Sequence, residues 1–406
     1  MNMEESQVNM KKKVLFMLIN MNVGGTEKAL LTMLSEIPKD KYDITLLLLE
    51  EIGGFMESIP DEVEVIHLKN YDKMKTLLND PPNVQAKRFM KQGQWLKAAN
   101  IIKHRILAKV FGERKLFFQY VLRDHHPLKD TYDVAIAYAG PMDFISYYIA
   151  EEVTAKKKVQ WIHFDITKIG FNRKFASKTY QRFDNIFVVS DEGKDKLISF
   201  TPRLKNKIER FSNILSQKLI VQLADEGKGF EDEFQGIRIL TVGRLSKEKG
   251  QDLSIPVLAK LKAAGYEVRW YCVGDGQAKS EYQRLIKQYK VENDYILLGA
   301  DPNPYPYMKQ CDLYVQSSRH EGYCITLAEA RCFDNPIITT HFTGAKEQIT
   351  HGETGLIVEF DQEQMFTAIK RLLDDALLRK KLKKNLRNEK VDTTVEMERF
   401  YHLVDN

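Results

Sequence analysis

Short apolar runs alternate with longer amphipathic stretches along most of the chain. An apolar run of about four to eight residues between turn residues is typical of a buried strand, and the stretches between such runs are typical of helices. Strands that alternate with helices pair in parallel, so the pattern predicts an α/β fold with a parallel sheet in each half. We expect strands at residues 13–19, 43–49, 63–68, 133–138, 157–162, 185–189, 237–242, 267–273, 295–298, 312–316, 336–340 and 355–358.

The same pattern divides the chain into two parts. Residues 222–236 are rich in Gly, Glu and Asp and poor in apolar side chains, which is typical of a connecting segment. We place the boundary near residue 215, which gives domains at residues 1–215 and 216–390. The last stretch, from residue 362 to residue 406, is helical and charged.

Residues 312–330 are the most informative segment, because a short strand, a tight loop and a helix follow one another there. Glu321 falls in the loop and Glu329 about two turns into the helix, roughly 10 Å further along its axis. The first amides of a helix lack backbone partners and suit an anion such as a diphosphate. A nucleotide sugar fits this spacing, with its sugar beside Glu321, its ribose beside Glu329 and its diphosphate on the residues Gly322, Tyr323, Cys324, Ile325 and Thr326.

Two glutamates at this separation are more often ordinary helical residues, so their surroundings decide between the readings. Glu329 lies among apolar residues, where a carboxylate is costly unless something hydrogen-bonds it. The helix also follows a strand, and ligands of parallel sheets bind beyond the carboxyl ends of the strands.

Two upstream segments of the same half also suit a phosphate. Gly243 ends one strand, and Arg244 and Lys249 follow it with a planar donor fork and a point charge. Gly274 and Asp275 end the next strand, where glycine lets the backbone approach a base or a ribose. Each signal alone is weak, but together they predict a diphosphate site at one edge of a sheet.

Residues 237–360 resemble the donor-binding half of a retaining glycosyltransferase of family 4, the group 1 class with the GT-B fold. The family usually has glycine where this chain has Cys324, and we expect the backbone amide to serve in the same way. The motifs that carry the resemblance are Gly243-Arg244-Leu245 with Lys249-Gly250, Val273-Gly274-Asp275-Gly276, the pair Glu321 and Glu329, Pro336-Ile337-Ile338, and the closing residues 352–358.

The resemblance implies two Rossmann-like domains that face each other across a cleft. Residues 1–215 would bind the acceptor, residues 216–390 the nucleotide sugar, and residues 391–406 would form a helix that returns to the first domain. The loop with Gly24 and Gly25 resembles the glycine loop that lies under the donor sugar in this family. His163 ends a strand, and such a histidine is more often structural, but family members commonly have one there that contacts the transferred sugar.

The implied reaction is transfer of a sugar from a nucleoside-diphosphate sugar, most commonly a UDP-sugar, with retention of the anomeric configuration. The acceptor would be a glycan, a lipid-linked or a protein-linked group, in a setting such as bacterial surface polysaccharide assembly. We expect Arg244, Lys249 and the loop amides to stabilise the leaving diphosphate, with Glu321 and His163 at the sugar. No cofactor and no metal are expected, since no Asp-x-Asp pair lies in a suitable loop.

Composition limits the remaining classes. The 406 residues are 43% hydrophobic and 29% charged, with a net charge of +5, which is ordinary for a globular protein of two or three domains. No apolar run reaches the length of a membrane span, and the N-terminus lacks a signal-peptide pattern, so we expect a cytoplasmic protein. The four cysteines have no metal-site or disulfide spacing, and we expect them to be reduced.

Residues 83–130 form a basic insertion, with eleven Lys and Arg against three Asp and Glu. An apolar stripe runs beside these charges at helical spacing. One reading packs this stripe on the first domain; the other docks the region on anionic lipid headgroups at the inner face of the cell membrane, or on a lipid-diphosphate acceptor. No nucleic-acid recognition motif accompanies the charge. The stripe consists of Trp95, Ala99, Ile102, Ile106 and Val110.

Three other functions stay open at this point. An NAD-dependent oxidoreductase could use the Gly24-Gly25 loop with Glu50 or Glu51, although the full Gly-x-Gly-x-x-Gly pattern is missing and the second half would have no role. A non-catalytic GT-B partner subunit of a transferase would keep the cleft. A sugar-nucleotide epimerase of the same shape is the third.

Overall fold

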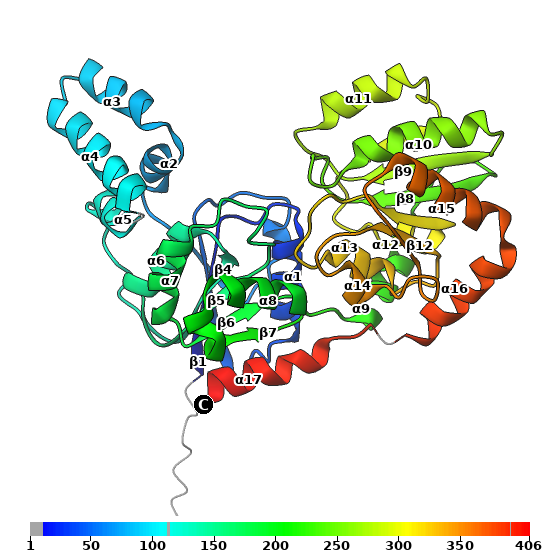
Figure 1. The fold of residues 1–406 in the computed structure, drawn as a ribbon. Coiled ribbons are helices and arrows are strands. Elements are labelled where there is room, and N and C mark those ends of the chain that lie inside the picture. The colour runs from blue at the N-terminus through cyan, green and yellow to red at the C-terminus, as the bar shows by residue number, and fades with distance from the viewer. Residues whose placement is uncertain (1–10, 112–113, 390) are drawn as a thin grey trace, which may run out of the picture.

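The computed structural model describes residues 11–111, 114–389 and 391–406, and these form two α/β domains, each around a parallel sheet (Figure 1). The N-terminal residues before Lys11, on which the signal-peptide expectation rests, lie outside the described residues. All twelve expected strands are present, and the predicted fold class is confirmed. The short strand β7 was not predicted.

The first sheet has the order β3-β2-β1-β4-β5-β6-β7. Its strands are β1 (Lys12–Leu18), β2 (Tyr42–Leu48), β3 (Glu64–His67), β4 (Thr131–Gly140), β5 (Thr154–Ile162), β6 (Asn185–Val188) and β7 (Ile208–Arg210). The helices of this part are α1 (Gly25–Glu36), α2 (Tyr71–Asn79), α3 (Pro82–Lys91), α4 (Trp95–Phe111), α5 (Arg114–Leu122), α6 (Asp143–Glu151), α7 (Arg173–Thr179) and α8 (Asp191–Phe200).

The second sheet has the order β10-β9-β8-β11-β12-β13. Its strands are β8 (Ile237–Val242), β9 (Val268–Val273), β10 (Tyr295–Gly299), β11 (Leu313–Gln316), β12 (Ile337–Thr340) and β13 (Leu356–Val358). The helices from here on are α9 (Gln217–Glu226), α10 (Gln251–Ala263), α11 (Lys279–Gln288), α12 (Tyr305–Gln310), α13 (Ile325–Ala330), α14 (Ala345–Gln348), α15 (Gln362–Asp374), α16 (Ala376–Asn388) and α17 (Met397–Asp405). Residues 222–226 of the expected connecting segment therefore belong to a helix.

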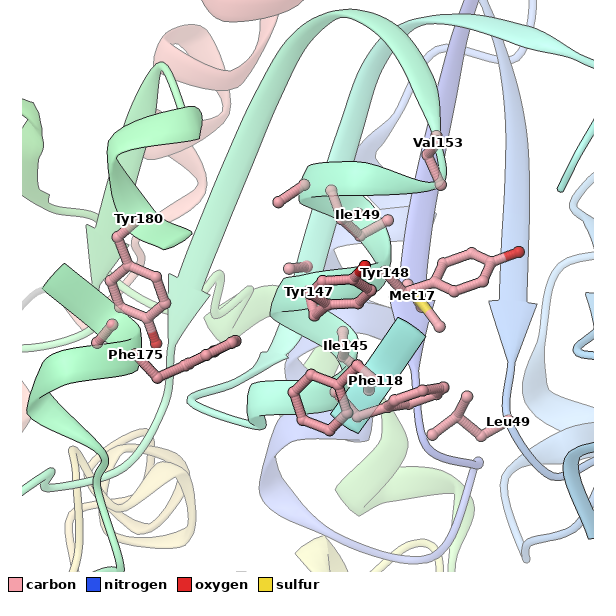
Figure 2. Close-up of a cluster of buried hydrophobic side chains, with 14 of the residues drawn as sticks. Met17, Leu49, Phe118, Ile145, Tyr147, Tyr148, Ile149, Val153, Phe175 and Tyr180 are labelled. Carbon is pink, nitrogen blue, oxygen red and sulfur yellow. The ribbon is translucent and has the colours of Figure 1, made fainter. Parts of the chain in front are cut away.

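Both faces of the first sheet are covered, which is why its central strands are continuously apolar. Along β1, Leu15 and Met17 join one core, whereas Val14, Phe16 and Leu18 join the core on the opposite face. This alternation is the two-residue period of a strand. Figure 2 shows the first of these cores, with side chains of α6 and Phe118 of α5 packed beside Met17.

The C-terminal helix α17 lies under the first domain, as expected from the sequence (Figure 1). Its Phe400 is fully buried and stacks on Phe16 of β1 with 6.1 Å between ring centroids. The hydroxyl of Tyr42 donates to the Asp405 carboxylate at 3.0 Å. The C-terminal helix, which follows the second domain in the chain, therefore packs on the sheet of the first domain and supports it.

The basic insertion forms a helical hairpin of α3 and α4 that stands away from the first sheet (Figure 1). The reading in which its apolar stripe packs on the first domain is wrong for the described members, because Trp95, Ala99, Ile102 and Ile106 are exposed. The neighbouring face of α4, with Ala98 and Ile101, is the buried one. The side chains of Arg105, Lys109 and Val110, and residue Glu113, lie outside the described part.

Candidate active site

Two loops that follow central strands bring the predicted residues together. In the second sheet β8 and β11 are neighbours although they are far apart in sequence, so the strand order reverses between them. Lys249 follows β8, and Glu321 follows β11. Such a reversal leaves a crevice beyond the strand ends, where parallel sheets bind their ligands.

Glu321 and Lys249 form a partly buried ion pair at this position. The Lys249 Nζ lies 2.6 Å from Glu321 Oε1, and their side chains are 17% and 11% exposed. Burial by itself would lower the pKa of Lys249, but the charge and hydrogen bond of Glu321, together with Cys324, raise it above its ordinary value. Lys249 therefore stays charged at every physiological pH.

A chain of buried polar groups orients the Glu321 carboxylate. Ser318 Oγ donates to Glu321 Oε1 at 2.6 Å, and Gln316 Nε2 donates to Ser318 Oγ at 2.8 Å. The Thr326 hydroxyl donates to the other end of Gln316 at 3.2 Å. Thr326, which we expected at a phosphate oxygen, thus has its proton turned inward. Sequence reasoning missed Gln316 and Ser318, which look like ordinary strand-end residues.

Glu329 lies in the second turn of α13, and its side chain is only 2% exposed. Its Oε1 accepts a hydrogen bond from the Tyr305 hydroxyl at 2.8 Å, and Lys28 Nζ of the first domain lies 2.8 Å away. Its Oε2 is buried without a partner among the described residues. Lys28, which packs over the Tyr305 ring at 4.3 Å, was not predicted because nothing in the sequence shows that α1 meets α13.

His163 is buried where β5 ends, and its Nε2 has no hydrogen-bond partner among the described groups. Burial lowers the pKa of His163 to about 3, against which a backbone hydrogen bond with Tyr138 acts. The ring is therefore neutral at physiological pH, and one of its nitrogens makes no hydrogen bond to the described residues.

The two domains touch beside these groups. A Cβ added at Gly322 would lie 2.0 Å from the carbonyl oxygen of His163, so only glycine fits there. A Cβ at Gly25 would lie 3.5 Å from Ile325 Cδ1, which places the first-domain glycine loop, with Gly24 at the start of α1, against α13. The structure thus brings residues predicted in both halves to one place.

Glu27, in the first turn of α1, is a candidate that the sequence reasoning did not include. Burial raises its pKa, and the charge of Arg244 from the second domain acts in the opposite direction. Arg244 itself is exposed. The position of Glu27 in the sequence, just after the glycine pair at the start of a helix, could have identified it as a candidate.

The glycine turns after β8 and β9 pack directly on each other. A Cβ at Gly274 would lie 2.0 Å from the Gly243 carbonyl oxygen. Asp275 is exposed and pairs with Lys279 at 2.7 Å. Asp275 therefore lies on the surface, whereas Gly243 lies at the close contact between the ends of β8 and β9.

Cys324 precedes α13 in the left-handed conformation, with φ of 63°. This region favours glycine, because a Cβ there costs roughly 1–2 kcal/mol. The backbone turn that presents the loop amides is therefore kept in spite of the side chain, which is buried. The helix α13 that follows has only six residues.

Comparison with known proteins fits this geometry. Residues 230–389 match the model of the family "Glycosyl transferases group 1". Crystal structures of HepE from Anabaena share the fold; one, with UDP and glucose, has a TM-score of 0.69 and 18% identity, and covers 98% of this chain and 100% of that chain. The chain has the GT-B glycosyltransferase fold.

Among the curated relatives, a Campylobacter jejuni protein is 35% identical over 52% of this chain and 57% of its own length. It is named N-acetylgalactosamine-N,N'-diacetylbacillosaminyl-diphospho-undecaprenol 4-alpha-N-acetylgalactosaminyltransferase. The amylovoran biosynthesis glycosyltransferase AmsD of Erwinia amylovora is 21% identical over 88% of this chain and 89% of its own. The chain spans about half the length of the first curated relatives that it matches. Group 1 similarity is thus supported for the second GT-B domain, while family 4 stays a prediction.

Proposed function

We propose that this protein is a glycosyltransferase of family 4 that moves a hexose from a UDP-sugar to a glycan, lipid-linked or protein-linked acceptor, with retention. The observation that carries the proposal is the partly buried pair of Lys249 and Glu321 at the strand-order reversal, in the loop whose Gly322 meets the backbone of His163. The proposal is supported by the named function of the Campylobacter relative and by HepE, whose structures contain UDP and UDP-glucose. Bacterial polysaccharide or glycoconjugate assembly is the proposed setting, in line with the relative AmsD.

In this reaction the bond between the anomeric carbon and a diphosphate oxygen breaks, and its electron pair leaves with the diphosphate. Negative charge therefore grows where Lys249 is held and where Arg244 reaches from an exposed position. Preorganised cations stabilise such a transition state without reorganisation. Glu321 accepts from Lys249 and Ser318 through Oε1, which leaves Oε2 for hydroxyl groups of the sugar.

His163 acts at the sugar as a neutral hydrogen-bonding group. Its low pKa, caused by burial, keeps a positive charge away from the anomeric carbon, which itself becomes positive as the bond breaks. Glu329 would bind the ribose through Oε2, since Oε1 is already held by Tyr305 and Lys28. No step in this scheme requires a cofactor, and we propose that the donor is bound without a metal.

The test combines donor binding with turnover. A panel of nucleotide sugars is screened by thermal shift, because a ligand that binds the folded state raises the melting temperature. With the donor so found, Lys249→Ala is expected to lower release of the nucleoside diphosphate about 10²–10³-fold. Lys247→Ala is the matched control, because Lys247 lies in the same loop with an exposed side chain.

Three results would contradict the proposal. The first is that no nucleotide sugar shifts the melting temperature. The second is that NADH binds instead, as a change in its fluorescence would show. The third is wild-type turnover by Lys249→Ala. Tight donor binding with neither hydrolysis nor transfer would favour the non-catalytic partner subunit. A product in which the nucleotide remains attached to an altered sugar would favour the epimerase.

A further inference from the structure

The α3–α4 hairpin ends in a turn whose side chains have no protein neighbour to cover them. Trp95 and Leu96, at the start of α4, are 67% and 84% exposed. In Figure 1 this hairpin stands apart from both sheets. Trp161 and Trp270, by contrast, are at most 1% exposed, so Trp95 is the one exposed tryptophan of the three in the chain.

The exposure is not confined to the turn. Ile102 and Ile106 continue the same stripe along α4 and are 39% and 55% exposed. Among the described residues, six of the fifteen exposed large apolar side chains lie between residues 84 and 116. Exposed large apolar side chains concentrated in one segment in this way are typical of a surface for a partner or a membrane.

Positive charge surrounds this patch. Residues 82–111 contain seven Lys and Arg and no Asp or Glu. In the part of the chain that the structure describes, Lys87, Lys91, Lys97 and Lys103 are exposed and form no ion pair. Elsewhere on the two domains, exposed cations such as Lys381 and Lys279 pair with acidic residues, here Glu353 and Asp275. The hairpin therefore presents uncompensated charge of one sign.

Tryptophan beside lysine distinguishes between the two kinds of occupant. Protein interfaces are enriched in Trp but depleted in Lys, whereas both residue types anchor helices in the headgroup region of a bilayer. We propose that the hairpin docks on an anionic lipid bilayer, with Trp95 and Leu96 inserted at the interface and the four free lysines on headgroup phosphates. This inference is independent of the sugar transfer proposed above, because it depends on the hairpin alone.

The test is flotation of the full-length protein with phosphatidylcholine vesicles that contain or lack phosphatidylglycerol. At low salt the protein is expected to float with the anionic vesicles and to be released at high salt, because screening weakens surface attraction. Lys91→Gln with Lys97→Gln is expected to weaken partitioning at least about tenfold, since each lysine near an anionic surface contributes substantially. Lys380→Gln with Lys384→Gln, a pair of exposed lysines on α16, is the matched control.

Insertion is read separately from attraction. Addition of anionic vesicles is expected to shift the tryptophan emission to shorter wavelength, and Trp95→Phe is expected to abolish the shift because the other two tryptophans are buried. Leu96→Ser is expected to weaken flotation, whereas Leu377→Ser, at a residue 79% exposed on α16, is expected to leave it unchanged. The altered side chains are exposed, so the variants keep their fold, which circular dichroism checks.

Two outcomes would overturn the inference. One is equal partitioning on neutral and anionic vesicles, or on neither, together with an unchanged Trp95 emission. The other is that the protein requires Trp95 to bind another protein in solution and does not bind the vesicles, which would make the hairpin a protein-docking surface.

Discussion

At the scale of single residues, the candidate site depends on side chains that hold the proposed binding residues in one orientation. Glu321 is held by Lys249 and Ser318, and Ser318 is in turn held by Gln316, which is fully buried. Satisfied buried networks of this kind keep side chains in one orientation. Glu321 and Lys249 could be predicted because charged residues in a strand-end loop stand out in a sequence. Gln316 and Ser318 could not, because their importance comes only from contacts in the fold.

His163 carries the prediction that belongs to this scale. In the unfolded chain its imidazole takes up a proton near pH 6.5, whereas burial holds its pKa at about 3 in the folded protein. Its contribution to stability is therefore complete above pH 6.5 and falls as the pH decreases toward 3, by about 1.4 kcal/mol per pH unit. His163→Asn removes this dependence.

Denaturant unfolding of wild type and variant at pH 7, 6 and 5 provides the measurement. The effects of the other titrating groups cancel in the comparison, because both proteins contain them. The difference in free energy of unfolding between wild type and His163→Asn is expected to shrink as the pH falls through this range. A difference that stays constant would mean that His163 takes up a proton equally readily in the folded and unfolded states, and burial would then not be what keeps it neutral.

At the scale of elements, the strands were the most predictable part of the molecule. They are buried on both faces and therefore read as apolar runs, which the alternating cores on either side of β1 show directly. The strand β7 was not predicted, because it has only three residues and two of them, Glu209 and Arg210, are exposed. Of the two readings of α4, the one in which its apolar stripe packs on the first domain was wrong, because helical spacing identifies an apolar face but not whether a neighbour covers it.

The helix α17 gives the prediction at this scale. Phe400→Ala empties a fully buried position on the sheet of the first domain, and such a change costs about 3–5 kcal/mol of unfolding free energy. Denaturant unfolding followed by tyrosine and tryptophan fluorescence measures it. Val395→Ala, at a residue 73% exposed just before α17, is the control and is expected to change little. A loss below about 1 kcal/mol for Phe400→Ala would show that α17 is a replaceable cover.

At the scale of the whole molecule, several contacts hold the domains in a closed arrangement. Lys28 reaches Glu329, and Lys196 bridges Asp165 and Thr343 at 2.8 and 2.7 Å. The contacts of Lys28 with Glu329 and of Lys196 with Thr343 are not visible in the sequence, because each joins residues more than a hundred positions apart. The proposed site takes residues from both domains, so the proposed transfer would depend on this closed arrangement.

Gly322 tests this coupling, because its place in the closed arrangement admits no side chain. The Cβ of Gly322→Ala would lie 2.0 Å from the His163 carbonyl oxygen, a backbone atom that has no freedom to rotate away. We expect both domains to stay folded but to separate at this point, which small-angle X-ray scattering would record as a larger radius of gyration.

Donor turnover by Gly322→Ala is expected to fall about 10²-fold, since a displacement of about 1 Å between reacting groups has that effect. Gly170→Ala is the control, because a Cβ at Gly170 meets nothing within 4 Å. If Gly322→Ala keeps the wild-type radius of gyration and turnover, the contact between Gly322 and His163 has no part in function. If only turnover falls, the alanine disturbs the loop around Glu321 without opening the domains, and closure would have to be attributed to Lys28 and Lys196 instead.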